Sequence, residues 1–274
     1  MSGIVINGGS RVVNKYEVGR SLWKGVAVPY CLYGSEVTHY REGDIAHLEK
    51  AQNTVGRWGL GAPRSTAVEA VRGDMGWSTF RERIIKGKLG FLKKVEAFEG
   101  DRWAKKVLQE NRTESTWQKE LERWKRRENM SDRWRDTSFK ETKRRIEKNG
   151  QDKWREGINR KTTLQWYSRK DKPEAVTWHT GDWGSRLLFK ARTGTLEVNG
   201  KSRDGGSQLC DCGSGDTETV EHLLVACRNY DRERERLVRA VVTVIGEEEW
   251  DRRADRRRAG SVHCTRIIWR QAGY

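Results

Sequence analysis

Three of the five cysteines and one of the five histidines of this 274-residue chain lie in one short stretch, CDCGSGDTETVEHLLVAC, at residues 210–227. Cys thiolate and His imidazole are the donors that tetrahedral Zn²⁺ prefers, and a structural zinc site needs four of them. The stretch supplies four, Cys210, Cys212, His222 and Cys227. One ion would hold their donor atoms within about 2.0–2.3 Å. If they bind one ion, the chain can adopt only those local folds in which the four side chains converge.

The spacing of His222 and Cys227 restricts the fold further. Five residues on an α-helix leave two side chains about 140° apart around the axis. Both can reach one ion only if the helix ends near residues 226–228, and Leu223 and Leu224 would then face a small core. The Cys-x-Cys pair is followed by GSG, which allows a tight turn.

Buried free thiols are the alternative interpretation of this cluster. Five cysteines are an odd number and too few for a disulfide scaffold, so we expect reduced thiols or metal ligands. Cys31 and Cys264 occur singly, and the dipeptide His263–Cys264 is a weaker source of donors. We favour zinc as the cofactor because all four donors lie so close together in the sequence.

The charge of the chain points to a polyanionic partner. Lys and Arg number 55 against 39 Asp and Glu, which gives a formal net charge of +16. Such a charge favours nucleic acid first and an anionic membrane surface second. No apolar run approaches the ~18 residues that span a bilayer, and the N-terminus has no signal-peptide core. We therefore expect a soluble intracellular protein, cytoplasmic and/or nuclear, that is neither secreted nor inserted in a membrane.

Most of the net positive charge, +10 of +16, lies between residues 101 and 170, which hold 22 Lys and Arg, 12 Asp and Glu, and six Trp. Trp117, Leu121 and Trp124 follow one another at helical spacing. Either a solvated helix packs its Trp on a neighbour, or a basic surface binds phosphates and stacks its Trp on bases. The two interpretations are compatible. The candidate nucleic-acid contacts are Arg123, Trp124, Lys125, Arg126, Arg127, Trp134, Lys143, Arg144 and Arg145.

Capping patterns predict several short helices elsewhere. One runs from an N-cap at Asp44 to a stop at Gly59 or Gly61, and a second has a Thr66–Glu69 capping box and a stop at Gly73. A third begins with the Thr79–Glu82 box and has a buried face of Ile84, Ile85, Leu89, Leu92 and Val95. Beyond residue 182 we expect a helix that ends at Gly194, then a strand, and a final helix from residue 230.

Several segments carry a resemblance to a known family. They are LWKGVAVPYCLYGSEV, LEKAQNTVGRWGLGAPRSTAVEAVRGDMGWSTFRERI, DRWAKKVL, RLLFKARTGTLEVNG and the cysteine–histidine block, in this order. Together they resemble the C-terminal third of the large open reading frame of non-LTR retrotransposons (LINE elements), downstream of the reverse-transcriptase palm. The resemblance covers most of residues 11–230, and P-x-x-LYGSE and LGAPRSTAVEA…GWSTF are its most specific parts.

The resemblance implies a mainly α fold. It comprises a helical thumb-like bundle at 1–100, a long basic Trp-rich helical linker at 101–181, a small zinc-stabilised α(+β) module at 182–246 and a charged tail at 247–274. The family's terminal motif is Cys-x1–3-Cys-x7–8-His-x4-Cys. Cys210, Cys212, His222 and Cys227 match its four ligands, although nine residues separate Cys212 from His222 here.

The function that the resemblance implies is nucleic-acid binding, with RNA and/or DNA as partners. Polymerase chemistry needs paired metal-binding aspartates, and the sequence contains no Asp-Asp pair, nor any counterpart of the family's endonuclease. We therefore expect a non-catalytic remnant of a LINE-type reverse transcriptase, with a separate palm in trans as a further partner. A zinc-stabilised protein-interaction module and a non-functional truncated retroelement product remain open alternatives.

Overall fold

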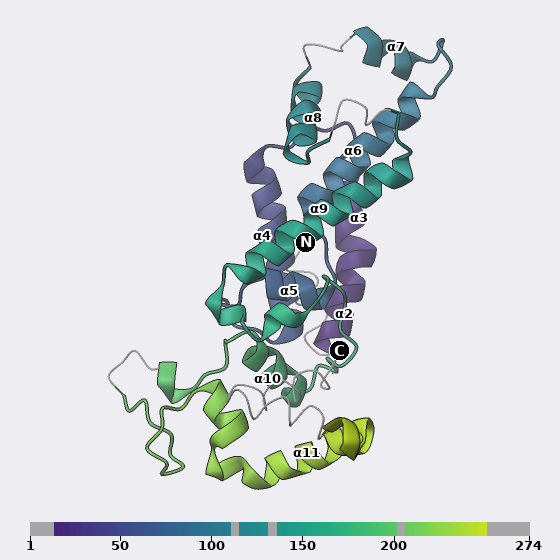
Figure 1. Ribbon diagram of the computed structural model, residues 1–274. Helices are drawn as coiled ribbons and strands as arrows, with labels where there is room; N and C mark the ends of the chain where they lie inside the picture. Colours follow the sequence, from purple (N-terminus) through teal and green to yellow (C-terminus); the bar gives the residue numbers. More distant parts are fainter. Residues whose placement is uncertain (1–13, 111–114, 131–135, 202–205, 251–274) are drawn as a thin grey trace.

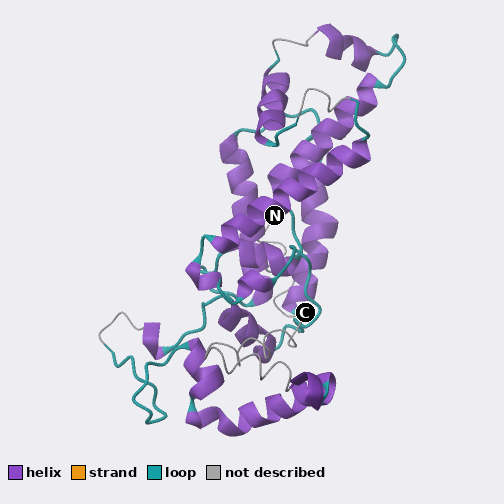
Figure 2. Cartoon of the chain, in the orientation of Figure 1, coloured by secondary structure: helices purple, strands orange, loops and turns teal. Residues whose placement is uncertain are grey.

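The computed structural model describes residues 14–110, 115–130, 136–201 and 206–250, and this part of the chain is mainly α-helical (Figures 1 and 2). Its α-helices are α2 (Lys15–Leu22), α3 (Val28–Leu32), α4 (Glu42–Leu60), α5 (Val68–Met75), α6 (Phe80–Glu96), α7 (Trp103–Glu110), α8 (Thr116–Arg127), α9 (Phe139–Asn159), α10 (Trp183–Arg192) and α11 (Asp231–Ile245). Short 3-10 or π turns are η1 (Trp23–Ala27), η3 (Thr162–Leu164), η4 (Tyr167–Arg169), η5 (Asn199–Lys201), η6 (His222–Ala226) and η7 (Arg228–Tyr230). The predicted fold class is confirmed.

The β content of the described residues is smaller than expected. Gly194 ends α10 in the left-handed region, at φ +64°, as predicted. The strand expected after it does not form, and the chain instead enters the 3-10 turn η5. An isolated antiparallel bridge joins Leu209 to Thr217. The C-terminal module therefore relies on turns and on side-chain contacts, not on a sheet.

The helix ends follow local capping chemistry, with three corrections. Asp44 is not the N-cap of α4: it lies in the first turn, where its Oδ2 accepts a hydrogen bond of 3.0 Å from the backbone N–H of Arg41. Gly61, at φ +62°, ends that helix. Thr79 caps α6 as predicted, and its hydroxyl accepts from the N–H of Glu82 at 3.1 Å.

The other two corrections concern α5. The predicted Thr66–Glu69 capping box does not form, because Ala67 is the N-cap and the hydroxyl of Thr66 lies 3.5 Å from that of Thr195. Gly73 does not end this helix. The helix begins after Ala67 and continues to Gly76, which takes the left-handed conformation. Gly73 lies in its interior, where a Cβ would stand 2.9 Å from the ring of Trp154. Its lack of a side chain therefore allows a close approach to α9, and not the end of a helix.

Helix α6 is the axis of the bundle. Figure 1 shows α9 running beside it, with α7 and α8 against one end. The predicted buried face is confirmed, since Ile84, Ile85, Leu89, Leu92 and Val95 are all buried. The main core cluster extends along the chain from Tyr16 to Phe189 and so includes side chains from three of the four regions that the sequence suggested.

A buried cation fastens α8 to α6. The Nζ of Lys88 lies 5.7 Å from the ring centroids of both Trp117 and Trp124, and 3.3 Å from Oε2 of Glu120. Lys88 and Glu120 are almost completely shielded from solvent. These two tryptophans therefore act as packing and cation–π partners of a lysine inside the protein.

A buried carboxylate, Asp74, connects three other parts of the fold. Its Oδ1 lies 3.3 Å from Nζ of Lys170 and accepts a hydrogen bond of 2.7 Å from the hydroxyl of Tyr167. Its Oδ2 lies 3.2 Å from Nη1 of Arg192. Its backbone carbonyl accepts from the hydroxyl of Tyr16 at 2.7 Å. One residue of α5 thus contacts α2, the segment around η4 and α10.

Replacing Asp74 by alanine is expected to lower the free energy of unfolding by about 3–5 kcal/mol, because two buried cations lose their counter-charge. Urea unfolding followed by far-UV circular dichroism measures the change. Asp152→Ala removes an exposed carboxylate from α9 and is the matched control, with an expected cost of about 0.5 kcal/mol or less. Equal losses from the two variants would contradict the role given to Asp74.

The C-terminal part has its own small cluster of apolar side chains. Ala191, Val198 and Val220 are its buried members, and Leu223 and Leu224 pack against it. Helix α11 lies at the opposite end of the molecule from α7 (Figure 1). In the part of the chain that the structure describes, no helix is both long and apolar enough to cross a membrane.

Candidate metal centre

A tight loop holds the first two cysteines. The N–H of Cys210 donates to the carbonyl of Asp216 at 2.9 Å, and the N–H of Glu218 donates to Gln208 at 2.9 Å. Between these bonds Gly213 and Gly215 take φ values of +74° and +78°, which side-chain-bearing residues rarely adopt. The loop therefore reverses directly after Cys212 and leaves both thiols on its inner side.

A π turn brings His222 and Cys227 together. The N–H of Cys227 donates to the carbonyl of His222 at 2.8 Å, so the hydrogen bond spans five residues and not four. This wider turn returns residue i+5 to the side of residue i. Cys227 is already in the extended region, so the helical turn ends where the sequence required. Leu223 and Leu224 face the small apolar cluster, as predicted.

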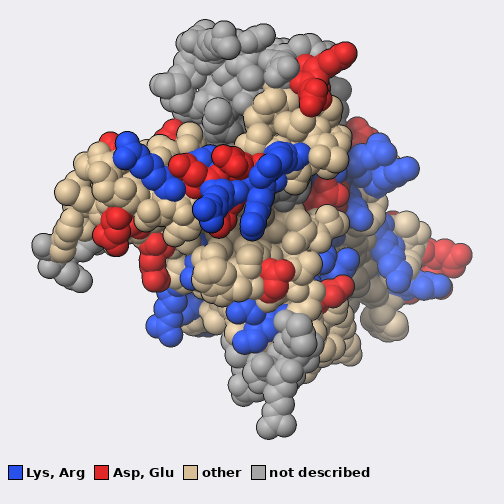
Figure 3. All heavy atoms as spheres, turned by 90° about the horizontal axis from the view of Figure 1, so that it is seen from below, with Lys and Arg blue, Asp and Glu red and all other residues tan. Residues whose placement is uncertain are grey.

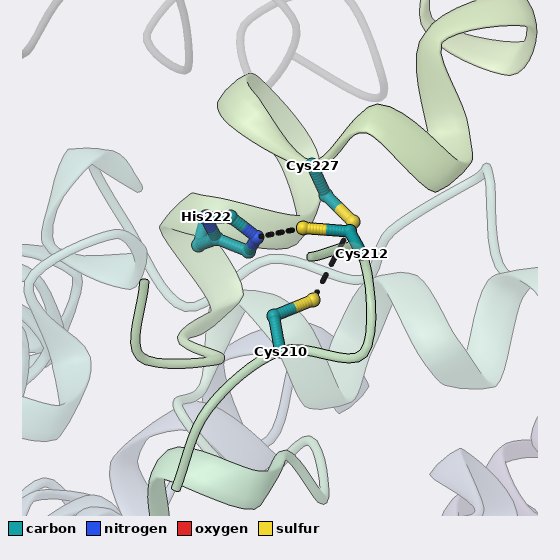
Figure 4. Close-up of side chains that lie close together, drawn as sticks. All are labelled: Cys210, Cys212, His222 and Cys227. Atoms are coloured by element: carbon teal, nitrogen blue, oxygen red, sulfur yellow. Dashed lines mark hydrogen bonds between the residues drawn. The ribbon is translucent and has the colours of Figure 1, made fainter. Parts of the chain in front are cut away.

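The four predicted ligands converge on one point (Figure 4). The Sγ atoms of Cys210 and Cys227 are 3.6 Å apart, and Sγ of Cys212 lies 3.4 Å from Nε2 of His222. All four donor atoms lie within 4.8 Å of one another. A tetrahedral Zn²⁺ with ligands at about 2.0–2.3 Å places neighbouring donors about 3.3–3.8 Å apart. The two sulfurs are too far apart for a disulfide, whose S–S bond is about 2.05 Å.

The pKa values of two thiols in the cluster, Cys212 and Cys210, are shifted in opposite directions. Hydrogen bonds with the side chain and backbone of Ser214 lower the pKa of Cys212 to about 6. At Cys210 a backbone hydrogen bond from Cys212 favours the thiolate, but desolvation and the hydrogen bonds with Cys227 and Cys212 outweigh it and raise the pKa to about 11. The sulfurs are thus close enough to share protons, which a divalent cation would displace on binding.

The carboxylate of Asp216 lies near the second ring nitrogen of His222. Its Oδ2 lies 3.6 Å from Nδ1 of His222, and the backbone N–H of His222 donates to the hydroxyl of Thr219 at 3.0 Å. Metal-bound histidines commonly pair their second ring nitrogen with a carboxylate in this way. The arrangement leaves Nε2 directed toward the three sulfurs.

The donor set fits a structural metal ion such as zinc. Three thiols and one imidazole fill all four positions of a tetrahedron, whereas a catalytic zinc keeps one position for water or substrate. Three local features direct these donors inward: the loop with Gly213 and Gly215, the π turn, and the contact of Asp216 with His222. A metal ion bound here would therefore stabilise the local fold of residues 208–230.

Comparison of the chain with protein-family models, with curated proteins and with solved structures finds no match. Its function is therefore inferred from its own residues. The two features that bear on it are the Cys3His cluster and the distribution of charge on the helices.

Two of the predicted nucleic-acid contacts are buried. Trp124 is buried against Lys88, and Lys125 is buried with an ion pair to Glu122, so neither can meet a nucleic acid in this conformation. Trp134 lies outside the described residues. The exposed members are Arg123, Arg126, Arg127, Lys143, Arg144 and Arg145.

Two of these exposed arginines have structural partners. Nη1 of Arg127 lies 2.6 Å from Oε1 of Glu42, and Nη2 of Arg145 donates to the carbonyl of Asn129. Each therefore also ties α8 or the chain after it to a neighbouring helix. The positive charge of these two residues is in part neutralised or fixed by the fold.

The sequence singled out Lys143 and Arg144 but not Lys140 and Lys148, which lie on the same exposed face of α9. Lys140, Arg144 and Lys148 recur every four residues and are exposed, and Lys143 lies beside them. In this first half of the helix the opposite side buries Thr142 and Ile146, whereas Trp154 and Ile158 are buried further along the helix. A helical wheel of FKETKRRIEKNG would have shown this separation, because the cations follow the i, i+4 spacing of one helix face.

Purified protein is expected to contain about one zinc ion per chain, since the four donors complete one tetrahedron. Cys212→Ala or His222→Ala should release the ion and loosen residues 208–245 while the α2–α10 bundle stays folded. Elemental analysis and the thermal transition of the far-UV signal measure the two effects. Cys31→Ser is the control, because Cys31 lies in α3, away from the cluster. Wild-type protein that holds no zinc would contradict the assignment.

Proposed function

We propose that this chain is a non-catalytic RNA- and/or DNA-binding protein that resembles the C-terminal region of LINE reverse transcriptases. Its binding surface is the exposed basic face of α9, formed by Lys140, Lys143, Arg144 and Lys148. This face is the observation that carries the proposal. Zinc in the Cys3His centre has a structural role.

The charge on this face is available to a ligand. Within the described part of the chain, no carboxylate pairs with any of its four cations. From Lys140 to Lys148 the face extends about 12 Å along the helix axis. Cations in such a row neutralise consecutive phosphates and release the counterions that surround a nucleic acid. Backbone contacts of this kind carry no sequence information.

Charge, not base stacking, accounts for the expected affinity. Trp117, Trp124 and Trp154 pack within the protein, and the indole N–H of Trp154 donates to the carbonyl of Glu69 at 2.8 Å. Their rings therefore serve the fold. The basic face of α9 has no exposed tryptophan among its described neighbours in the helix, so a steep dependence on salt is expected.

The metal loop is a poor candidate for phosphate binding. Residues 210–227 contain Asp211, Asp216, Glu218 and Glu221 but no Lys or Arg. Figure 3 views the molecule from the end where α11 lies and shows acidic side chains next to basic ones on that face. The division of roles is therefore structural for the metal centre and electrostatic for α9.

A second candidate function, a protein-interaction module, is favoured by a different surface. Val26, Tyr30, Tyr33 and Val37 are all exposed and follow one another along the first helical segment and the turn after it. Val37 also lines an apolar groove of about 380 Å³ between α6, α7 and α8. An exposed apolar surface of this kind is typical of protein contacts.

Reversing the four cations of the α9 face to glutamate is expected to weaken RNA and DNA binding alike and to flatten its salt dependence. Each lost phosphate contact lowers the slope of log K against log salt by about 0.7–0.9. Fluorescence anisotropy over a range of salt concentrations measures the slope. The control reverses four exposed arginines at the other end of the molecule, Arg228, Arg232, Arg236 and Arg239.

The two sets of substitutions change the net charge equally. Equal losses would show that overall charge, and not the α9 face, determines binding. If wild-type protein shows no salt-dependent binding at all, the nucleic-acid proposal fails and the protein-interaction module becomes the better interpretation.

The isolated chain is expected to extend no primer when supplied with template, nucleotides and Mg²⁺ or Mn²⁺, because the sequence has no aspartate pair to hold two catalytic metal ions. A primer-extension assay measures this, with an active reverse transcriptase as the positive control. Templated synthesis above the level of a buffer blank would contradict the non-catalytic assignment.

A further inference from the structure

Helix α11 has few attachments to the rest of the protein. Val241 is buried, but Leu237 and Val244 on the same helix are exposed. The elements that pack most closely against α11 are η6 and η7, which are the turns on either side of Cys227. The metal loop is thus the main structural neighbour of α11.

One side chain of α11 reaches into that loop. Nη2 of Arg234 donates a hydrogen bond of 2.7 Å to the backbone carbonyl of Cys227 and also contacts the carboxylate of Asp231. The Arg234 side chain is 18% exposed, although it carries a full charge. Its other terminal nitrogen, Nη1, is buried and has no acceptor among the described residues.

A metal-loaded cluster would explain why this cation is tolerated there. Three thiolates and one Zn²⁺ have a formal charge of −1, and a neutral histidine does not change it. A guanidinium held against the backbone of a ligand residue compensates that charge. The attraction between the two becomes stronger where water is excluded.

We propose that Arg234 is a positioning residue of the metal centre, and that ion binding at the Cys3His cluster holds α11 in place through Arg234. The inference rests on the metal centre proposed above. Cys227 is fixed twice, by its sulfur at the ion and by its carbonyl at α11. When the ion leaves, Cys227 loses the bond at its sulfur, and its N–H bond to the carbonyl of His222 is left to hold the π turn, so its carbonyl holds Arg234 less firmly.

The sequence of α11 supports this dependence. Its first half, DRERER, alternates charges of opposite sign, and most of its side chains are exposed. A 15-residue helix with so little buried surface is marginal in water on its own. Release from the metal loop should therefore both undock and partly unfold it.

The test uses the full-length protein loaded with zinc. Hydrogen–deuterium exchange over residues 231–245 reports the state of α11, and competition with a fluorescent chelator gives the zinc affinity. Chelation of wild-type protein is expected to raise exchange in α11 strongly and to leave α4, α6 and α9 unchanged. Arg234→Gln is expected to raise α11 exchange with zinc present and to weaken zinc binding by about 10-fold, as loss of an outer-sphere partner commonly does.

Arg236→Gln is the matched control, since it removes an exposed arginine from the same helix and should change neither measurement. Arg234→Lys keeps the charge but loses the planar fork, so partial recovery of zinc affinity is expected. A purely structural role in α11 would alter exchange but not zinc affinity.

The outcomes separate the two proposals. If wild-type protein binds no zinc, both the metal centre and this inference fail. If it binds zinc but chelation leaves α11 protected, or if Arg234→Gln has the zinc affinity of wild type, the metal centre stands and the inference is overturned.

Discussion

The fold depends on one buried carboxylate. Asp74 is fully shielded from solvent and lies between the cations of Lys170 and Arg192, with the hydroxyl of Tyr167 as a third donor. A charge inside a protein is tolerated only where opposite charges and hydrogen bonds surround it. Because its partners come from distant parts of the sequence, their ion pairs can form only when α5, the η4 segment and α10 have all reached their places. The arrangement therefore favours one packing of the helices over the alternatives.

The features that the sequence predicted well are those set by local chemistry. The Thr79–Glu82 box gave the start of α6, and helical periodicity gave its buried face. The cysteine–histidine spacing even implied that the turn after His222 must depart from a regular α-helix, and the structure realises this as a π turn. These properties depend on residues within one or two turns of each other, so a single sequence contains the necessary information.

The features that it missed depend on contacts between distant residues. Nothing near Trp124 shows that it will cover Lys88, which comes from another helix, so its ring could equally have been assigned to the surface. Gly73 carries the usual signal of a helix end, yet it is a point of close packing, because its neighbours Trp154 and Tyr167 follow about ninety residues later. The tertiary structure is therefore needed to tell a glycine that ends a helix, or a tryptophan that could stack on bases, from one that packs inside the protein.

The close approach at Gly73 also limits how the molecule can move. The backbone of α5 touches the rings of Trp154 and Tyr167 directly, and no flexible side chain lies between them to absorb a displacement. Sliding of α9 along α5 would press the Trp154 ring, which α9 carries, against main-chain atoms that cannot move aside. The central part of the helical bundle, around α5 and α9, should therefore be rigid. Bending should therefore occur at the two ends of the molecule. One end holds α7 and α8, and the other holds the metal loop and α11 (Figure 1).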